Sequence, residues 1–258
     1  MEQIDLLKIL FDKDFMYYLI VGFIAALIDG ALGMAYGVSC NTMLLGLGVS
    51  PASASASVHV AKIFTGGVSG LAHWRLGNIE RKLLWQLTIS GCLGGAVGAY
   101  LISMMNYPWI KPAIAIYLMI MGIIILTKAF KKTLIFKDTK QVELLAAFGG
   151  FMDSIGGGGW GPIVTGSLLG TGKKPSITIG TVNSAEFFVA LVSSGVFGVL
   201  LHFTHLEVIF ALIIGGVAAA PLGAYFVKLI KPRSAMILVG ITIIILSLRT
   251  LIVTLEQM

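Results

Sequence analysis

The sequence predicts an all-α polytopic membrane protein made of two repeats, and three observations support this prediction. Hydrophobic residues make up 57% of the 258 residues and charged residues 12%, whereas charged residues approach about a quarter of a typical soluble domain. Several apolar runs are long enough to cross a hydrocarbon core as a helix, which takes about 20 residues. One pattern of acidic, glycine and proline residues also occurs twice, 124 residues apart.

The repeat is clearest when residues 29–64 are aligned with residues 153–188 without a gap. Identical residues then fall at Asp29/Asp153, Gly33/Gly157, Gly37/Gly161, Leu44/Leu168, Leu45/Leu169, Gly46/Gly170, Gly48/Gly172, Pro51/Pro175, Val58/Val182, Ala61/Ala185 and Phe64/Phe188. A duplicated unit whose apolar segments are interrupted at matching places is typical of secondary transporters. The interruptions indicate where the substrate binds.

The predicted elements follow one order in both repeats. Residues 1–14 are amphipathic and acidic, which predicts a short interfacial segment and argues against a cleaved signal peptide. Each repeat begins with a glycine-broken apolar segment and continues with three plain helices, and a polar linker separates the two repeats. The first repeat spans 15–127 (broken segment 15–47; helices 54–74, 83–105 and 110–130), the linker 128–140, and the second repeat 141–258 (broken segment 143–170; helices 176–201, 206–230 and 233–254).

The positive charges in the loops favour an inverted topology for the two repeats. If each broken segment crosses the membrane, the loop Lys and Arg residues divide eleven to six between the two sides. If each broken segment instead re-enters as a hairpin, the repeats are inverted and the division becomes thirteen to four. Positive residues accumulate on the cytoplasmic side. The hairpin arrangement is therefore favoured, with both termini outside.

The break in the second repeat is the stronger of two candidate binding elements. Residues 153–162 read DSIGGGGWGP, and four glycines followed by a proline cannot continue a helix, because glycine costs about 1 kcal/mol and proline about 3 kcal/mol relative to alanine. Glycine amides and a following half-helix favour an anion. Close helix packing is the alternative reading of such small residues. The first break keeps Asp29, Gly33 and Gly37 but has Tyr36 at the place of Trp160, which argues against a strictly symmetric site.

Ionisable residues within membrane segments indicate function, because a charge near the bilayer centre costs at least about 2.5–3.5 kcal/mol. His59 and Lys62 lie three residues apart on one helix face, and their repeat partners are Asn183 and Glu186. Lys62, His59 and the glycine amides together predict an anion site, in which Glu186 balances Lys62 or accepts a proton. A purely structural ion pair between the repeats is the alternative.

The candidate site residues form two groups. Asp29 and Asp153 either cap the broken half-helices or carry protons, and Trp160 and Tyr36 either gate the pocket or fill space beside the glycines. The predicted substrate-binding residues are Gly33, Tyr36, His59, Lys62, Gly156, Gly157, Gly158, Gly159, Trp160 and Asn183. The predicted coupling or charge-balancing residues are Asp29, Asp153 and Glu186.

The paired breaks and the LLG-x-G-x-x-P elements that follow them, at 44–51 and 168–175, resemble the sulfite exporter TauE/SafE family of membrane permeases. The resemblance covers essentially the whole chain. It implies export of sulfite or related organosulfonates across the bacterial inner membrane.

Other function classes fit the sequence less well. The glycine run lacks the Lys-Ser/Thr of a phosphate-binding loop, which argues against a nucleotide-driven pump. No nucleophile and base pattern or metal-ligand spacing is evident, so we expect no enzyme activity, metal or cofactor. The net charge of +6 resides in loops and reflects topology, not nucleic acid binding. The expected partners are a small anion, the lipid bilayer and protons as a coupling ion. A passive anion channel remains the alternative, and the oligomeric state is open, a homodimer included.

Overall fold

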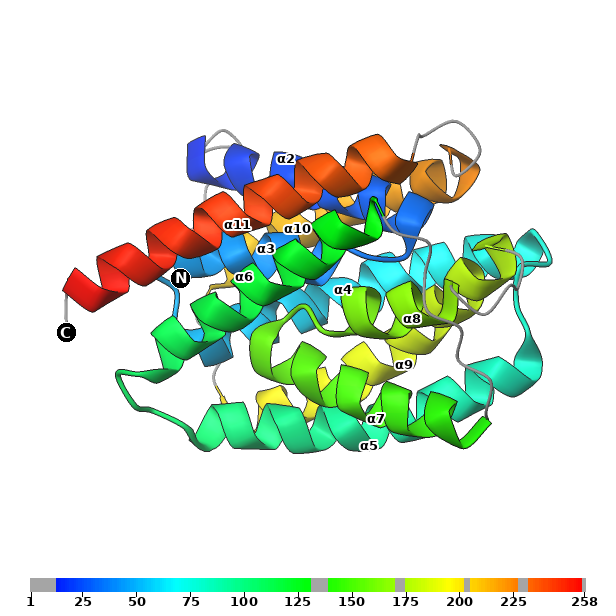
Figure 1. Cartoon of the computed structure of the whole chain (residues 1–258), viewed down its shortest axis with the longest axis horizontal. Coiled ribbons are helices and arrows are strands. Elements are labelled where there is room, and N and C mark those ends of the chain that lie inside the picture. The colour runs from blue at the N-terminus through cyan, green and yellow to red at the C-terminus, as the bar shows by residue number, and fades with distance from the viewer. Residues whose placement is uncertain (1–12, 131–138, 170–174, 202–204, 227–231, 257–258) are drawn as a thin grey trace, which may run out of the picture.

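The computed structural model describes residues 13–130, 139–169, 175–201, 205–226 and 232–256, and within these ranges the regular structure is helical (Figure 1). Five of the described helices are long and apolar enough to cross a membrane. The prediction of a polytopic all-α membrane protein is therefore confirmed. Most of the predicted interfacial segment (1–14) and of the linker (128–140) lies outside the described residues.

The two halves contain the same series of helices. The first half consists of α2 (Lys13–Leu32), α3 (Tyr36–Gly46), α4 (Pro51–Arg75), α5 (Arg81–Met104) and α6 (Ile110–Lys128). The second half consists of α7 (Thr139–Gly156), the π-helical turn η1 (Trp160–Thr165), α8 (Gly166–Leu168), α9 (Pro175–Leu200), α10 (Leu206–Phe226) and α11 (Pro232–Glu256). The first long helix after each broken segment, α4 or α9, begins at a repeat-related proline, Pro51 or Pro175. Proline suits this first helical position because its missing N–H would have no partner there.

The chain reverses direction at each break. α2 runs in the same direction as α10, because Gly22 packs on Leu212 and Leu27 packs on Gly223. α3 instead runs back toward the end where α2 begins (Figure 1). At that end, near the C-terminus of α11, the carbonyl of Gly46 accepts a hydrogen bond from Arg249. Each break is thus the tip of a hairpin, since α7 and α8 repeat this arrangement from the opposite end of the molecule (Figure 1).

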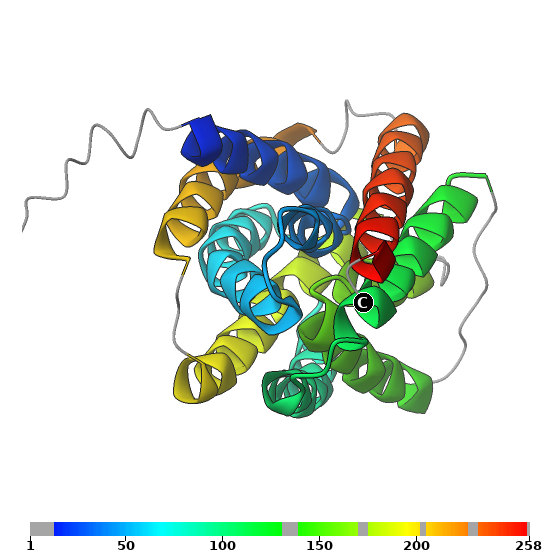
Figure 2. The same cartoon turned by 90° about the vertical axis from the view of Figure 1, so that its left-hand side faces the viewer.

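The halves are interlocked and do not form separate bundles. The most extensive helix packing joins α2 to α10, α7 to α5, α6 to α11 and α4 to α9. Each pair combines one helix from each half, and exchange of the halves reproduces the same set of pairs. Figure 2, viewed along the helices, shows α3 near the centre with α2, α4 and α11 around it. The hairpin tips consequently meet in the interior of the molecule.

α4 differs from the other long helices because it is polar and enclosed. It has 25 residues but is absent from the five apolar candidate spans, and its buried side chains include His59 and Lys62. By contrast, large apolar side chains such as Leu93 on α5 and Ile245 on α11 are exposed. An outward apolar surface suits lipid. The sequence thus turns the charged face of α4 toward the interior of the molecule.

Candidate functional site

Glycines with positive φ form both hairpin tips. Gly33 has a φ of 65° and its repeat partner Gly157 a φ of 69°, a left-handed conformation that L side chains adopt only at a cost. The amide of Gly33 donates to the carbonyl of Asp29, and the amide of Gly157 donates to the carbonyl of Asp153. These hydrogen bonds complete the last turn of α2 and of α7. The matching pair of glycines therefore ends α2 and α7 in the same way.

The repeat-related aspartates connect the two helical arms of each hairpin. The Oδ1 atom of Asp29 accepts a hydrogen bond from the amide of Tyr36 at 3.2 Å, and Oδ1 of Asp153 accepts from the amide of Trp160 at 3.2 Å. Each carboxylate thereby satisfies an amide at the start of the returning half-helix. The capping role considered for these residues is observed in both copies.

The two hairpin tips touch each other. A Cβ on Gly37 would collide with the carbonyl oxygen of Gly157, and a Cβ on Gly161 would lie 2.7 Å from the Cβ of Met34. Both contacts join a residue after one break to a residue at the other break. Small residues are needed here because the two backbones approach each other closely.

A cluster of buried charges lies beside this contact. The Nζ atom of Lys62 is 2.8 Å from Oδ2 of Asp153 and 2.8 Å from Oε1 of Glu186, and Nε2 of His59 is 3.2 Å from Oδ2 of Asp153. The exposed fractions of these residues do not exceed 8%. Lys62 on α4 therefore connects carboxylates that belong to the second half of the chain.

His59 contacts the backbone of its own helix with one ring nitrogen and lies near Asp153 with the other. Nδ1 of His59 is 2.8 Å from the carbonyl oxygen of Ser55. A carbonyl can only accept, so Nδ1 carries a hydrogen. The other ring nitrogen, Nε2, lies 3.2 Å from Oδ2 of Asp153. His59 is thus a second neighbour of the Asp153 carboxylate besides Lys62.

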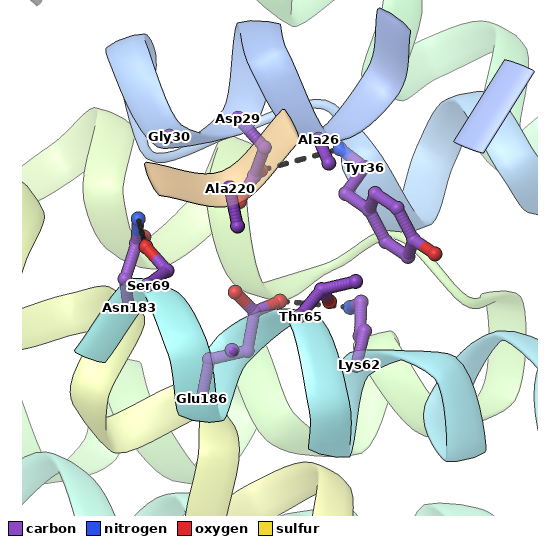
Figure 3. A pocket seen from close by; sticks show the side chains of 11 residues that line it. Ala26, Asp29, Gly30, Tyr36, Lys62, Thr65, Ser69, Asn183, Glu186 and Ala220 are labelled. Carbon is purple, nitrogen blue, oxygen red and sulfur yellow. Dashed lines mark hydrogen bonds and ion pairs between the residues drawn. The ribbon is translucent and has the colours of Figure 1, made fainter. Parts of the chain in front are cut away.

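A small cavity lies next to Lys62 and Glu186, with a volume of about 20 Å³. Figure 3 shows Lys62 and Glu186 on one side of it, with Asp29 and Tyr36 across from them. Its lining residues come from α2, α3, α4, α9 and α10, and are Ala26, Asp29, Gly30, Tyr36, Lys62, Thr65, Gly66, Ser69, Asn183, Glu186 and Ala220. This volume is enough for about one water molecule, so the cavity must widen before it admits an anion.

Comparisons with known proteins identify the family of the chain. The family model for the sulfite exporter TauE/SafE matches residues 18–250. The chain belongs to this family. A probable membrane transporter protein, YtnM, of Bacillus subtilis (strain 168) is 37% identical over 250 residues, which cover 93% of this chain and 83% of the relative. No solved structure matches the chain significantly. The resemblance seen in the sequence is confirmed, and this TauE/SafE member is a multi-pass membrane transporter.

The structure brings five predicted site residues of this TauE/SafE member to the cavity, namely Asp29, Tyr36, Lys62, Asn183 and Glu186. His59 and Asp153 lie on the far side of Lys62 from the cavity. Asp153 contacts Lys62, and His59 contacts Asp153. The glycines of the second break are placed by packing, with Gly156 against Tyr117, Gly157 against Asn41, Gly158 against Val38 and Gly159 against Asp153. Gly33 packs against Thr165 and Ile179. A substrate contact with these glycines stays a prediction.

Trp160 occupies the core of the family fold in this structure. It is fully buried, its indole N–H donates to the carbonyl of Val182 at 3.2 Å, and its ring fills the space that a side chain at Gly91 would need. Tyr36, its repeat partner, lines the cavity and donates to the carbonyl of Leu212 at 3.3 Å. The two aromatic residues thus have different surroundings despite their equivalent positions.

Sequence reasoning missed four polar residues near the site of this transporter. Thr65 and Ser69 line the cavity three and seven residues after Lys62, a helical spacing that points to the same face. The side chain of Asn41 donates to the carbonyl of Gly156, and Lys128 donates to the carbonyl of Pro162 at 2.6 Å. The last two contacts join the halves and leave no signal in the sequence.

Proposed function

We propose that this protein is a secondary transporter for small sulfur-containing anions, such as sulfite or short organosulfonates, in the bacterial inner membrane. The observation that carries the proposal is the position of Lys62. This buried cation lines a small cavity at the contact between two hairpin tips, where inverted-repeat transporters bind their substrates. The family membership supports the same substrate class.

The cavity offers hydrogen-bond donors suited to a compact oxyanion. The ammonium of Lys62 supplies charge, and the hydroxyls of Thr65 and Ser69 and the amide group of Asn183 supply neutral donors. Burial of such a set around one cation favours a ligand with several acceptor oxygens.

The hairpins support the inverted topology as part of this proposal. With three crossing helices in each half and re-entrant breaks, the connections at 75–82, 128–140, 170–174 and 227–233 lie on the cytoplasmic side. These loops contain most of the loop Lys and Arg residues. Alternating access then follows from movement of each hairpin with its packed partner helix around the fixed site.

The side of the termini tests the inverted topology directly. Cleavable tags at residue 1 and residue 258 are expected to be digested by protease added outside intact spheroplasts, whereas a tag inserted at 133 is expected to be protected. The reverse pattern, or termini on opposite sides, would contradict the proposed orientation. Cells opened before protease addition provide the control for tag accessibility.

Flux measurements test the transport function itself. Purified protein in proteoliposomes is expected to exchange labelled sulfite, thiosulfate or methanesulfonate for the same unlabelled anion in the lumen. Sulfate and chloride serve as comparison anions. Counterflow distinguishes a carrier from a passive channel, because a channel shows no accelerated exchange. If no sulfur anion moves while an unrelated solute does, the proposed substrate class is wrong.

A further inference from the structure

We propose that the cavity binds an anion together with a proton, so that the anion replaces the carboxylate of Glu186 at Lys62 while the proton neutralises Glu186. Anion and proton then cross the membrane as one electroneutral pair when the anion is monovalent. This inference rests on the proposed transport function and adds the coupling ion, its site and the resulting symport. It follows from the charge balance of the cluster and from the unequal fixation of its two carboxylates.

The cluster has no excess of positive charge without a substrate. Lys62 contacts two carboxylates, Asp153 and Glu186, and a third carboxylate, that of Asp29, lines the same cavity. Burial of unbalanced charge is strongly unfavourable. An entering anion therefore adds an uncompensated negative charge unless a cation enters with it. A proton on a carboxylate supplies this compensation within the cluster.

Asp153 is too firmly held to be the carboxylate that the anion replaces. Its oxygens contact Lys62 at 2.8 and 3.0 Å, His59 at 3.2 Å and the amide of Trp160 at 3.2 Å. Loss of Asp153 from this position would break the charge cluster and the cap of the second hairpin together. Asp153 thus stays in place while substrate binds.

Glu186 is held much more weakly and faces the cavity. Among the described residues, Lys62 is its one ionic partner, at 2.8 Å. A substrate oxyanion that enters from the cavity reaches Nζ of Lys62 from the side that Glu186 occupies (Figure 3). Replacement of this one contact restores the coordination of Lys62 and leaves the Glu186 carboxyl free to receive a proton.

The groups that surround Glu186 favour protonation when the anion is present. α4 presents Lys62, α2 presents Asp29, α3 presents Tyr36, α7 presents Asp153 behind Lys62, and α10 presents the apolar Ala220. Asp29 is hydrogen-bonded to an amide and forms no ion pair within the described part of the chain. With substrate on Lys62, an ionised Glu186 would face the anion and Asp29 without a cation of its own. A proton removes this repulsion.

Methanesulfonate is the probe of choice for this coupling because it remains a monoanion at all accessible pH values and cannot carry the proton itself. In wild-type proteoliposomes, an acidic exterior is expected to drive its accumulation by about tenfold per pH unit at equilibrium. A potential set by potassium and valinomycin is expected to change this accumulation little. The lumen is expected to acidify together with sulfonate uptake.

Glu186→Gln mimics the neutral carboxyl and should reverse both dependences. Sulfonate counterflow is expected to persist, accumulation in response to the pH gradient to be lost, and an inside-positive potential to drive uptake instead. Glu207→Gln, which alters an exposed carboxylate at the start of α10, is the matched control and should behave as wild type. Equal elution from size exclusion in detergent verifies the fold of each variant.

Three results would overturn the proposal. Potential-driven, pH-insensitive sulfonate flux in the wild type would leave transport intact and contradict the coupling alone. Undiminished pH-driven accumulation by Glu186→Gln would move the proton to another group. Absence of any sulfur-anion exchange in the wild type would refute the proposed function and with it this coupling.

Discussion

Lys62→Met is expected to reduce sulfur-anion exchange by about 100-fold or more. Methionine has a similar length but lacks the charge that meets the anion, and truncation of a buried charged partner costs about 2–5 kcal/mol of binding, with each 1.4 kcal/mol equal to tenfold. Initial rates of counterflow in proteoliposomes measure the effect. Lys82→Met, at an exposed position at the start of α5, serves as the matched control and should exchange anions at the wild-type rate.

The same substitution also disturbs the charge cluster, and a second variant separates the two effects. Without Lys62, the Glu186 carboxylate loses its cation, and removal of one partner from a buried pair costs about 3–5 kcal/mol of stability. Lys62→Met combined with Glu186→Gln removes one charge of each sign. This double variant is expected to recover most of the thermal stability while counterflow stays absent.

Recovery of flux in the double variant would contradict a ligand role for Lys62. Such a result would favour the structural ion pair, the alternative that the sequence left open. The structure contains that pair between Lys62 and Glu186, and Asp153 as a further partner. The lining of the cavity nevertheless favours a ligand role, because Thr65, Ser69 and Asn183 face it together with Lys62, and an ion pair that served packing alone would need no such polar lining.

The repeat in the sequence carried most of the information about the fold. Each glycine break falls at a hairpin tip, at Gly33 and Gly157. A left-handed residue and the small residues after it favour a reversal of the chain and disfavour continuation of the helix. The matching positions of Lys62 and Glu186 in the two copies also predicted that these residues meet. Repeat partners on α4 and α9 do lie together, since these helices pack along the pseudo-symmetry axis.

The contacts of Asp153 and Trp160 were beyond sequence reasoning for a physical reason. Asp153 lies 91 residues from Lys62 in the chain, and it reaches Lys62 because α7 packs on α5 and α4 in the other half. Trp160 is among the substrate-binding residues predicted from the sequence, but in the structure its ring packs against Gly91. Which side of a hairpin tip faces the cavity depends on interhelical packing, and local composition does not determine it.

The structure explains why the two breaks differ in their glycine content. The second tip contains Gly158 and Gly159, and side chains there would collide with Val38 and with the amide of Asp153. At the first tip, Ala35 has a φ of 128°, so this copy tolerates a side chain only in a strained conformation. The extra glycines thus let the second tip approach the first closely and hold Asp153 against Lys62. The glycine run positions a carboxylate, which is a different use from direct contact with an anion.

Gly157→Ala is therefore expected to impair both stability and transport. A non-glycine residue in the left-handed region costs about 1–2 kcal/mol, and the new Cβ would lie 2.6–2.7 Å from Cγ and Cβ of Asn41. Asn41 would have to move and would lose its hydrogen bond to the Gly156 carbonyl. We expect destabilisation of about 2–4 kcal/mol, equivalent to a fall in the unfolding temperature of roughly 5–15 °C. Anion exchange is expected to fall at least about tenfold, because the tip carries Asp153.

Gly195→Ala provides the comparison for this prediction. Gly195 lies within α9, and a Cβ there would meet no atom within 4 Å, so alanine is expected to stabilise the helix by about 0.5–1 kcal/mol. Thermal unfolding in detergent and counterflow in proteoliposomes apply to both variants. If Gly157→Ala matched Gly195→Ala in stability and flux, the left-handed tip and its contact with Asn41 would be dispensable. The positioning of Asp153 by the second hairpin would then need a different physical basis.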